Sequence, residues 1–190
     1  MKNAIIVHGM PNKEEFEKNG IFKHWLPWIK TELETKGVGV TIPEMPTPYA
    51  PIYEAWKEVF EQFPLTEETI LIGHSYGAGF LLRYLSENNV SVGKVALVAP
   101  WIDPDGYLAT LSLPNSFDFT PDNNLVEKTK GVTVFCSEDD DEYILESVRQ
   151  IKATYTGFDY KEFTDRGHFT TEPGYDNDTF PELLRVITND

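Results

Sequence analysis

The chain has 190 residues, of which 41% are hydrophobic and 25% are charged, proportions that are ordinary for a soluble globular protein. This length suits one domain, and we expect a single domain over residues 1–190. The 31 acidic and 16 basic residues give a net charge of -15, which disfavours nucleic acid and anionic membrane surfaces as partners. The single cysteine, Cys136, excludes an intramolecular disulfide, and no signal-peptide pattern follows Met1, so we expect a cytoplasmic protein.

Short apolar runs alternate with segments of helical spacing along the chain. We expect strands over residues 4–7, 38–41, 69–72, 92–99, 132–135 and 160–163. We expect helices over 22–36, 52–63, 76–87, 143–153 and 180–188, with Gly37 as the C-cap of the first. Strands that alternate with helices form parallel crossovers, so the pattern predicts an α/β fold. Residues 11–20 and 101–130 do not fit the alternation, and the second stretch is a candidate lid or crossover.

A G-x-S-x-G pattern, Gly73-His74-Ser75-Tyr76-Gly77, lies between the third predicted strand and a predicted helix. This context is that of a nucleophile elbow, a turn so tight that small residues must flank the serine. The turn would push Ser75 clear of the sheet, where a substrate can reach it. The pattern therefore predicts that Ser75 is a catalytic nucleophile.

A nucleophilic serine needs a base to take its proton and an acid to orient that base. The acidic residues 138–142 follow the fifth predicted strand, and His168 follows the sixth. The chain order serine, acid, histidine is that of α/β-hydrolases. Because sites on open parallel sheets form at the carboxyl edge, we expect His168 as the base and Asp139, Asp140 or Asp141 as the acid.

Acyl transfer also needs backbone N–H donors for the oxyanion that develops on the substrate. In this fold one donor follows the nucleophile and the other follows the first strand, which predicts Tyr76 and Met10. Three further residues are candidates for the substrate-binding site: His24 and Trp25 in the first helix, and Trp101 directly after the fourth strand. The alternative for His24 and Trp25 is core packing, which is the usual role of a tryptophan on an amphipathic helix.

We expect neither a metal nor a cofactor. The four histidines, His8, His24, His74 and His168, do not form a short ligand pair such as H-x-x-x-H. A dinucleotide-binding fingerprint also fails, because Gly77-Ala78-Gly79 is not followed by the third glycine. The predicted partner is a small-molecule acyl substrate, and the sequence does not indicate an oligomeric state.

At these residues the chain resembles the small α/β-hydrolase family that includes retinoblastoma-binding protein nine and the bacterial YdeN proteins. The resemblance spans nearly the whole chain and rests on residues 8–9, 24–28, 73–77, 137–140 and 163–169, the last being the most specific. It implies a compact α/β-hydrolase fold with six parallel strands in the order 2-1-3-4-5-6 and helices on both faces. It also implies a catalytic triad that matches Ser75, Asp140 and His168.

One segment departs from this family. Its members usually carry an apolar stretch with proline soon after the acid, whereas Asp141-Glu142-Tyr143-Ile144 follows here. Counting from Phe135 places Asp140 at the family's acid, while Asp139 and Asp141 remain alternatives.

The combined prediction is a serine hydrolase, carboxylesterase-like or peptidase-like, that cleaves a small ester, thioester or amide through an acyl-enzyme on Ser75. The alternative is a protein-interaction module of the same fold with little or no catalysis. For that alternative, residues 134–138 faintly resemble the L-x-C-x-E motif, although they begin inside a predicted strand.

Overall fold

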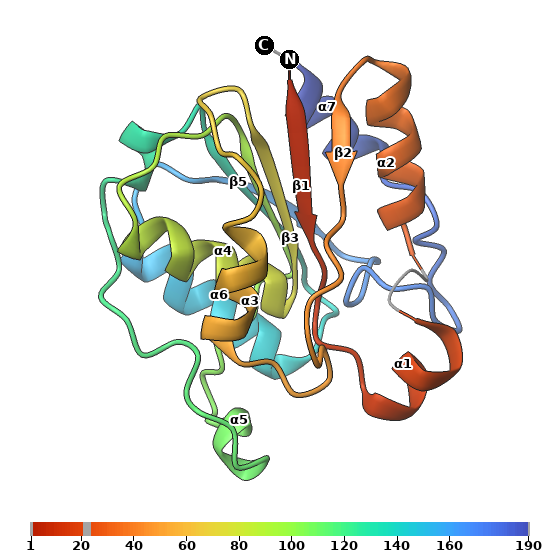
Figure 1. Ribbon diagram of the computed structural model, residues 1–190. Coiled ribbons are helices and arrows are strands. Elements are labelled where there is room, and N and C mark those ends of the chain that lie inside the picture. The colour runs from red at the N-terminus through yellow and green to blue at the C-terminus, as the bar shows by residue number, and fades with distance from the viewer. Residues whose placement is uncertain (1, 21–23, 190) are drawn as a thin grey trace.

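The computed structural model describes residues 2–20 and 24–189 and has a central sheet of six parallel strands (Figure 1). The strands are β1 (Asn3–Val7), β2 (Gly39–Thr41), β3 (Ile70–His74), β4 (Val95–Val98), β5 (Val132–Ser137) and β6 (Asp159–Phe163). Their order is β2-β1-β3-β4-β5-β6, as the resemblance implied. The predicted α/β-hydrolase architecture is therefore confirmed.

The central strands are apolar because helices cover both faces of the sheet. All residues of β3, β4 and β5 are buried, whereas β6 at one edge carries exposed charged side chains. Parallel pairing brings the carboxyl ends of the strands to one edge of the sheet. In Figure 1 this edge faces the bottom of the view, where α1 (Lys13–Asn19) and α5 (Tyr107–Thr110) also lie.

The long helices form one layer on each face of the sheet. In Figure 1, α2 (Leu26–Thr35) and α7 (Pro181–Thr188) lie on one face, and α3 (Tyr53–Phe60), α4 (Tyr76–Glu87) and α6 (Glu142–Thr154) lie on the other. Gly37 follows α2 with a φ of 78°, and its N–H donates to the carbonyl of Glu34, which confirms the expected glycine cap. The expected start of this helix, at residues 22 and 23, lies outside the described residues.

Residues 13–19 form a helix, α1, that the sequence pattern did not predict. Its sequence, KEEFEKN, has Phe16 as the only apolar residue, so it shows no apolar periodicity. The helix begins a few residues after β1, beside the predicted oxyanion donor Met10.

The long stretch 101–130 contains α5 and the 3₁₀ helix η1 (Leu125–Lys128), and it is held against α4 rather than drawn across Ser75. Tyr76 donates its hydroxyl to Ser116 Oγ at 2.8 Å, and Arg83 Nη1 donates to the Ser116 carbonyl at 2.9 Å. Gly79 leaves space for this packing, because a Cβ there would lie 2.1 Å from the carbonyl oxygen of Trp101. Only the beginning of the stretch borders the space in front of the nucleophile candidate.

Candidate active site

Ser75 lies on a sharp turn between β3 and α4, at the carboxyl edge of the sheet. Its φ of 53° and ψ of -121° are unusual for a residue with a side chain, and such a backbone costs of order 1–3 kcal/mol. The Ser75 N–H donates to the Val98 carbonyl at 2.9 Å, and the Ser75 carbonyl accepts from the Trp101 N–H at 3.2 Å. The surrounding backbone thus fixes the strained turn.

Two glycines of this elbow lie where no side chain fits. A Cβ on Gly77 would lie 2.3 Å from the Val7 carbonyl oxygen and 2.4 Å from that of His8. A Cβ on Gly73 would lie 2.6 Å from the Cα of Ala78. The start of α4 therefore packs directly on the end of β1, which requires Gly77, and its backbone folds closely over the end of β3, which requires Gly73.

We expect the Gly77→Ala variant to lose at least about 3 kcal/mol of unfolding free energy, since its Cβ would meet backbone that cannot move separately. Gly39→Ala is the matched control, because Gly39 lies in β2 with no neighbouring atom within 4 Å of the added Cβ. The control should change stability by less than about 1 kcal/mol. Urea denaturation of both variants measures the difference, and equal stabilities would contradict the packing argument.

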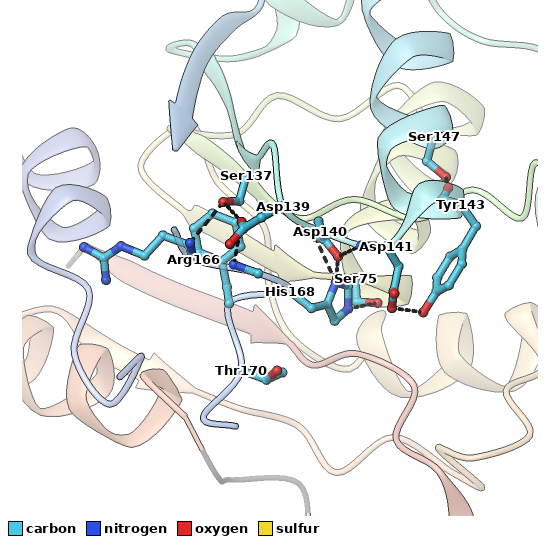
Figure 2. A network of polar contacts seen from close by, with 12 residues as sticks. Ser75, Ser137, Asp139, Asp140, Asp141, Tyr143, Ser147, Arg166, His168 and Thr170 are labelled. Carbon is cyan, nitrogen blue, oxygen red and sulfur yellow. Dashed lines mark hydrogen bonds and ion pairs between the residues drawn. The ribbon is translucent and has the colours of Figure 1, made fainter. Parts of the chain in front are cut away.

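Ser75, His168 and Asp140 form one chain of hydrogen bonds, although they come from three separate segments (Figure 2). His168 Nε2 lies 3.0 Å from Ser75 Oγ, and His168 Nδ1 lies 3.1 Å from each carboxylate oxygen of Asp140. A carboxylate only accepts, so Nδ1 carries the proton and Nε2 is free to accept from the serine hydroxyl. The structure thus brings together the three residues predicted from the sequence.

The Asp140 carboxylate is almost inaccessible, with 1% of its side chain exposed. Burial raises its pKa, and the hydrogen bonds from His168 and from the Asp141 N–H act in the opposite direction. The ion is therefore held by two N–H donors in a place that water scarcely reaches. This is the environment that fixes a histidine tautomer and stabilises a developing imidazolium.

The two neighbouring aspartates have different partners (Figure 2). Asp139 accepts from Ser137 Oγ and from the Gly167 N–H, and Asp141 accepts from the Tyr143 hydroxyl at 2.8 Å. Partial desolvation acts to raise the pKa of Asp139, but its hydrogen bonds outweigh this effect and hold the pKa below the usual range. Of the three carboxylates that the sequence left open, Asp140 is the one that contacts His168.

The loop that carries His168 is fixed through its backbone. Asn177 Nδ2 donates to the carbonyls of Arg166 and Thr170. His74 Nε2 donates to the carbonyl of His168, and Trp25 Nε1 donates to that of Phe169. From the other side, Ser137 Oγ accepts from the Arg166 N–H at 3.0 Å, and Asp139 accepts from the Gly167 N–H at 3.0 Å. These contacts hold the imidazole ring in register with Ser75.

The predicted oxyanion donors lie beside the nucleophile candidate. Tyr76 is the first residue of α4, and the first N–H groups of a helix have no partner within the helix. Met10 lines the same space as Ser75. Gly9 allows this approach, because a Cβ there would lie only 3.0 Å from the Cβ of Ser75. Tyr76 thus adjoins Ser75 in the chain, and Met10 borders the same cavities as Ser75.

Two cavities meet at Ser75 and His168, and both are bordered by residues 10–12. One has a volume of about 200 Å³ and is lined by His24, His74 and the loop 170–172. The other has a volume of about 380 Å³ and is lined by Trp101, among others. His24 and Trp101 therefore border the site, as the sequence suggested.

The prediction that Trp25 lines the substrate site is wrong for both cavities. Its side chain is fully buried and packs edge-on against Phe180. The indole N–H donates to the Phe169 carbonyl at 3.1 Å, beneath the loop that carries His168. Trp25 belongs to the core and supports the site from below.

The family is decided by the sequence as a whole. A family model described as serine hydrolase matches residues 4–189, almost the entire chain. The chain belongs to the serine hydrolase family. Membership agrees with the serine, histidine and aspartate at the sheet edge.

Relatives of this serine hydrolase agree with that result. The candidate hydrolase YdeN of Bacillus subtilis strain 168 is 28% identical over an alignment of 201 positions. The alignment covers 99% of this chain and 95% of YdeN. The YdeN crystal structure matches with a TM-score of 0.78 at 26% identity, covering 99% of this chain and 97% of the other. The fluorophosphonate-binding serine hydrolase FphF of Staphylococcus aureus shares the fold, with a TM-score of 0.60 at 13% identity over 100% of this chain and 84% of its own.

Neither a metal site nor a membrane-spanning helix is found in the part of the serine hydrolase that the structure describes. Within residues 2–20 and 24–189, no three His, Cys, Asp or Glu side chains are placed to hold one metal ion. In the same residues, no helix combines the length and apolar character needed to cross a bilayer.

Three residues that line the larger cavity of the serine hydrolase were not predicted from the sequence: Asp105, Tyr107 and Tyr143. A signal for Tyr143 was available, because it follows β5 and the acidic cluster at the carboxyl edge, the same argument that identified Trp101 after β4. Asp105 lies in a loop and Tyr107 begins the short helix α5, in a stretch whose sequence has no periodic pattern from which side-chain direction could be predicted.

Three histidines near the site are held uncharged: His8 and His74 are buried, and His24 is partly buried. Burial lowers the pKa of His8 to about 4, against a weaker opposing effect of its hydrogen bond to the Gly9 carbonyl. Burial and the nearby His168 and His8 lower the pKa of His24 to about 4. His74 is also held well below its usual pKa by burial and by its histidine neighbours.

These shifts predict a loss of stability in mild acid. A histidine in the unfolded chain binds a proton below about pH 6.5, whereas His8 in the folded chain binds one only below about pH 4. The unfolding free energy therefore falls as the pH is lowered from about 6.5 to about 4. We expect the His8→Asn variant to show a slope between pH 6.5 and 5 that is shallower by roughly 1 kcal/mol per pH unit. Urea denaturation at several pH values measures the slope; a slope equal to that of the wild type would contradict the assignment.

Proposed function

We propose that this serine hydrolase cleaves a small ester, thioester or amide through an acyl-enzyme on Ser75. The observation that carries the proposal is the hydrogen-bonded chain from Ser75 Oγ through His168 to the buried Asp140, with lengths of 3.0 and 3.1 Å. Ser75 and His168 border two cavities, which are large enough for the acyl group and the leaving group of a small substrate.

The proposed mechanism assigns one step to each group. His168 Nε2 takes the proton from Ser75 Oγ as the oxygen attacks the substrate carbonyl, and the resulting imidazolium faces the Asp140 carboxylate. The N–H groups of Tyr76 and Met10 stabilise the oxyanion. His168 then returns the proton to the leaving group, and in a second round it activates the water that releases the acyl group.

We place the activity in the cytoplasm, because the thiol of the single cysteine suits a reducing compartment. Burial of Cys136, together with nearby Glu162, raises the pKa of this thiol to about 11.

For the alternative of an interaction module, the motif-like residues 134–138 fall mostly within β5, which is buried along its whole length. A partner could not reach residues 134–137 in the folded chain, and only Glu138, which follows β5, is exposed.

A panel of p-nitrophenyl esters of increasing chain length and of aminoacyl amides tests the proposal. The wild type should hydrolyse part of the panel, with a rapid first release of about one nitrophenol per chain whenever deacylation is the slower step. The Ser75→Ala variant should show neither the burst nor turnover. Negligible and identical profiles for both proteins would move the assignment to the interaction module.

A further inference from the structure

Aromatic side chains dominate the larger of the two cavities at Ser75. The rings of Trp101, Tyr107 and Tyr143 line this space of about 380 Å³, and Asp105 lines it with them. The smaller cavity, lined by histidine and threonine side chains, has no such group of rings. The two sides of the nucleophile therefore differ in chemistry.

The three rings are inclined to one another rather than stacked. The Trp101 and Tyr107 ring centres lie 6.1 Å apart at an interplanar angle of 61°, and those of Trp101 and Tyr143 lie 6.4 Å apart at 75°. Although they contact Trp101, the two tyrosines remain 46% and 42% exposed, and they are among the four large apolar side chains that are exposed in the described residues. Rings arranged in this way form the walls of a box open on one side.

The charge at the box is negative and partly uncompensated. In the part of the chain that the structure describes, the Asp105 carboxylate forms no hydrogen bond or ion pair, and no lysine or arginine lines the cavity. Asp141 accepts from the Tyr143 hydroxyl. Burial and that carboxylate raise the pKa of the Tyr143 hydroxyl, so this hydroxyl stays protonated and the side chain uncharged.

We propose that this box, formed by Trp101, Tyr107, Tyr143 and Asp105, binds an alkylammonium group of the substrate, such as trimethylammonium. The proposal rests on the proposed function, because it names the substrate class of the same site. The negative faces of the rings attract a cation, and the nearby carboxylate adds to this attraction. The large negative net charge of the protein favours the approach of such a substrate.

A neutral group would fit the box less well. Apolar contact with the rings would be available to a tert-butyl group as well as to a trimethylammonium group. However, the neutral group would supply no counter-charge to the exposed Asp105 carboxylate and would not be attracted by the negative ring faces. The cation is therefore the better occupant of the same volume.

A pair of esters that differ only in charge tests the proposal. Choline acetate ester carries a quaternary nitrogen where 3,3-dimethylbutyl acetate carries a carbon, so shape and leaving oxygen are matched. We expect the wild type to show a kcat/KM about tenfold or more higher for the choline ester. The Tyr107→Leu and Asp105→Asn variants should each reduce this preference by threefold or more, whereas Tyr107→Phe should keep most of it.

The control for overall charge is Asp118→Asn, which removes one carboxylate from an exposed position outside the cavity and should leave the preference unchanged. Binding of choline and of 3,3-dimethylbutan-1-ol to the Ser75→Ala variant, measured by calorimetry, provides a readout without turnover. Tighter binding of choline would support the box even if neither ester were cleaved, an outcome that would count against the proposed function alone. Equal affinity for the two alcohols, or equal kcat/KM for the two esters, would overturn the box.

Discussion

The Ser75→Ala variant is expected to lose at least about 10⁴-fold in kcat on any ester that the wild type hydrolyses. The reason is that, among the residues that the structure describes, Ser75 has the only hydroxyl bonded to the His168 ring, with Oγ 3.0 Å from Nε2. Residual activity would come from the oxyanion donors and from binding alone. Steady-state kinetics on the best ester of the panel measures the loss.

Ser91→Ala is the matched control for this substitution. Ser91 is exposed and lies before β4, at the edge of the sheet opposite Ser75. Its replacement should leave kcat within about twofold of the wild type. If Ser75→Ala kept most of the activity while Ser91→Ala behaved as expected, another residue would have to be the nucleophile.

The Asp140→Asn variant is expected to lose about 10⁴-fold in kcat while remaining folded. Asparagine keeps the size of the side chain, but its amide can donate to His168 Nδ1 and so favours the wrong tautomer. The buried position of Asp140 leaves no room for water to take over the role. Kinetics combined with a thermal unfolding curve separates this effect from a loss of stability.

The neighbouring substitutions Asp139→Asn and Asp141→Asn serve as controls with the same change of charge. Asp139 binds the backbone of the His168 loop, so its replacement should lower stability and reduce kcat by much less than that of Asp140. Asp141 accepts from Tyr143 and should affect turnover least. A larger loss at Asp139 or Asp141 than at Asp140 would reassign the acid.

The order of strands and helices could be predicted because the central strands are buried on both faces and therefore read as apolar runs. The residues at which the strands begin and end could not be predicted in this way. Val92 is buried but lies before β4, since apolar burial does not require ladder hydrogen bonds. At the other end, Ala99 has a φ of 43°, a backbone that closes the strand and that no apolar pattern reports.

The meeting of Ser75, His168 and Asp140 could be predicted because chain order and the sheet edge bring their segments together. The direction of a side chain on a helix could not, since spacing alone does not say which face meets the core. Trp25 therefore supports the His168 loop from inside, while His24 beside it borders a cavity. The helix α1 escaped prediction for the related reason that its charged sequence carries no periodic signal.

Labelling with a fluorophosphonate probe tests whether Ser75 is an activated nucleophile. Mass spectrometry of the intact protein and of its peptides would count the adducts and locate them. We expect one adduct per folded chain, on the peptide that contains Ser75, and no adduct in the Ser75→Ala variant. An unlabelled Ser75, under conditions in which another serine hydrolase reacts fully, would show that Ser75 is not an activated nucleophile.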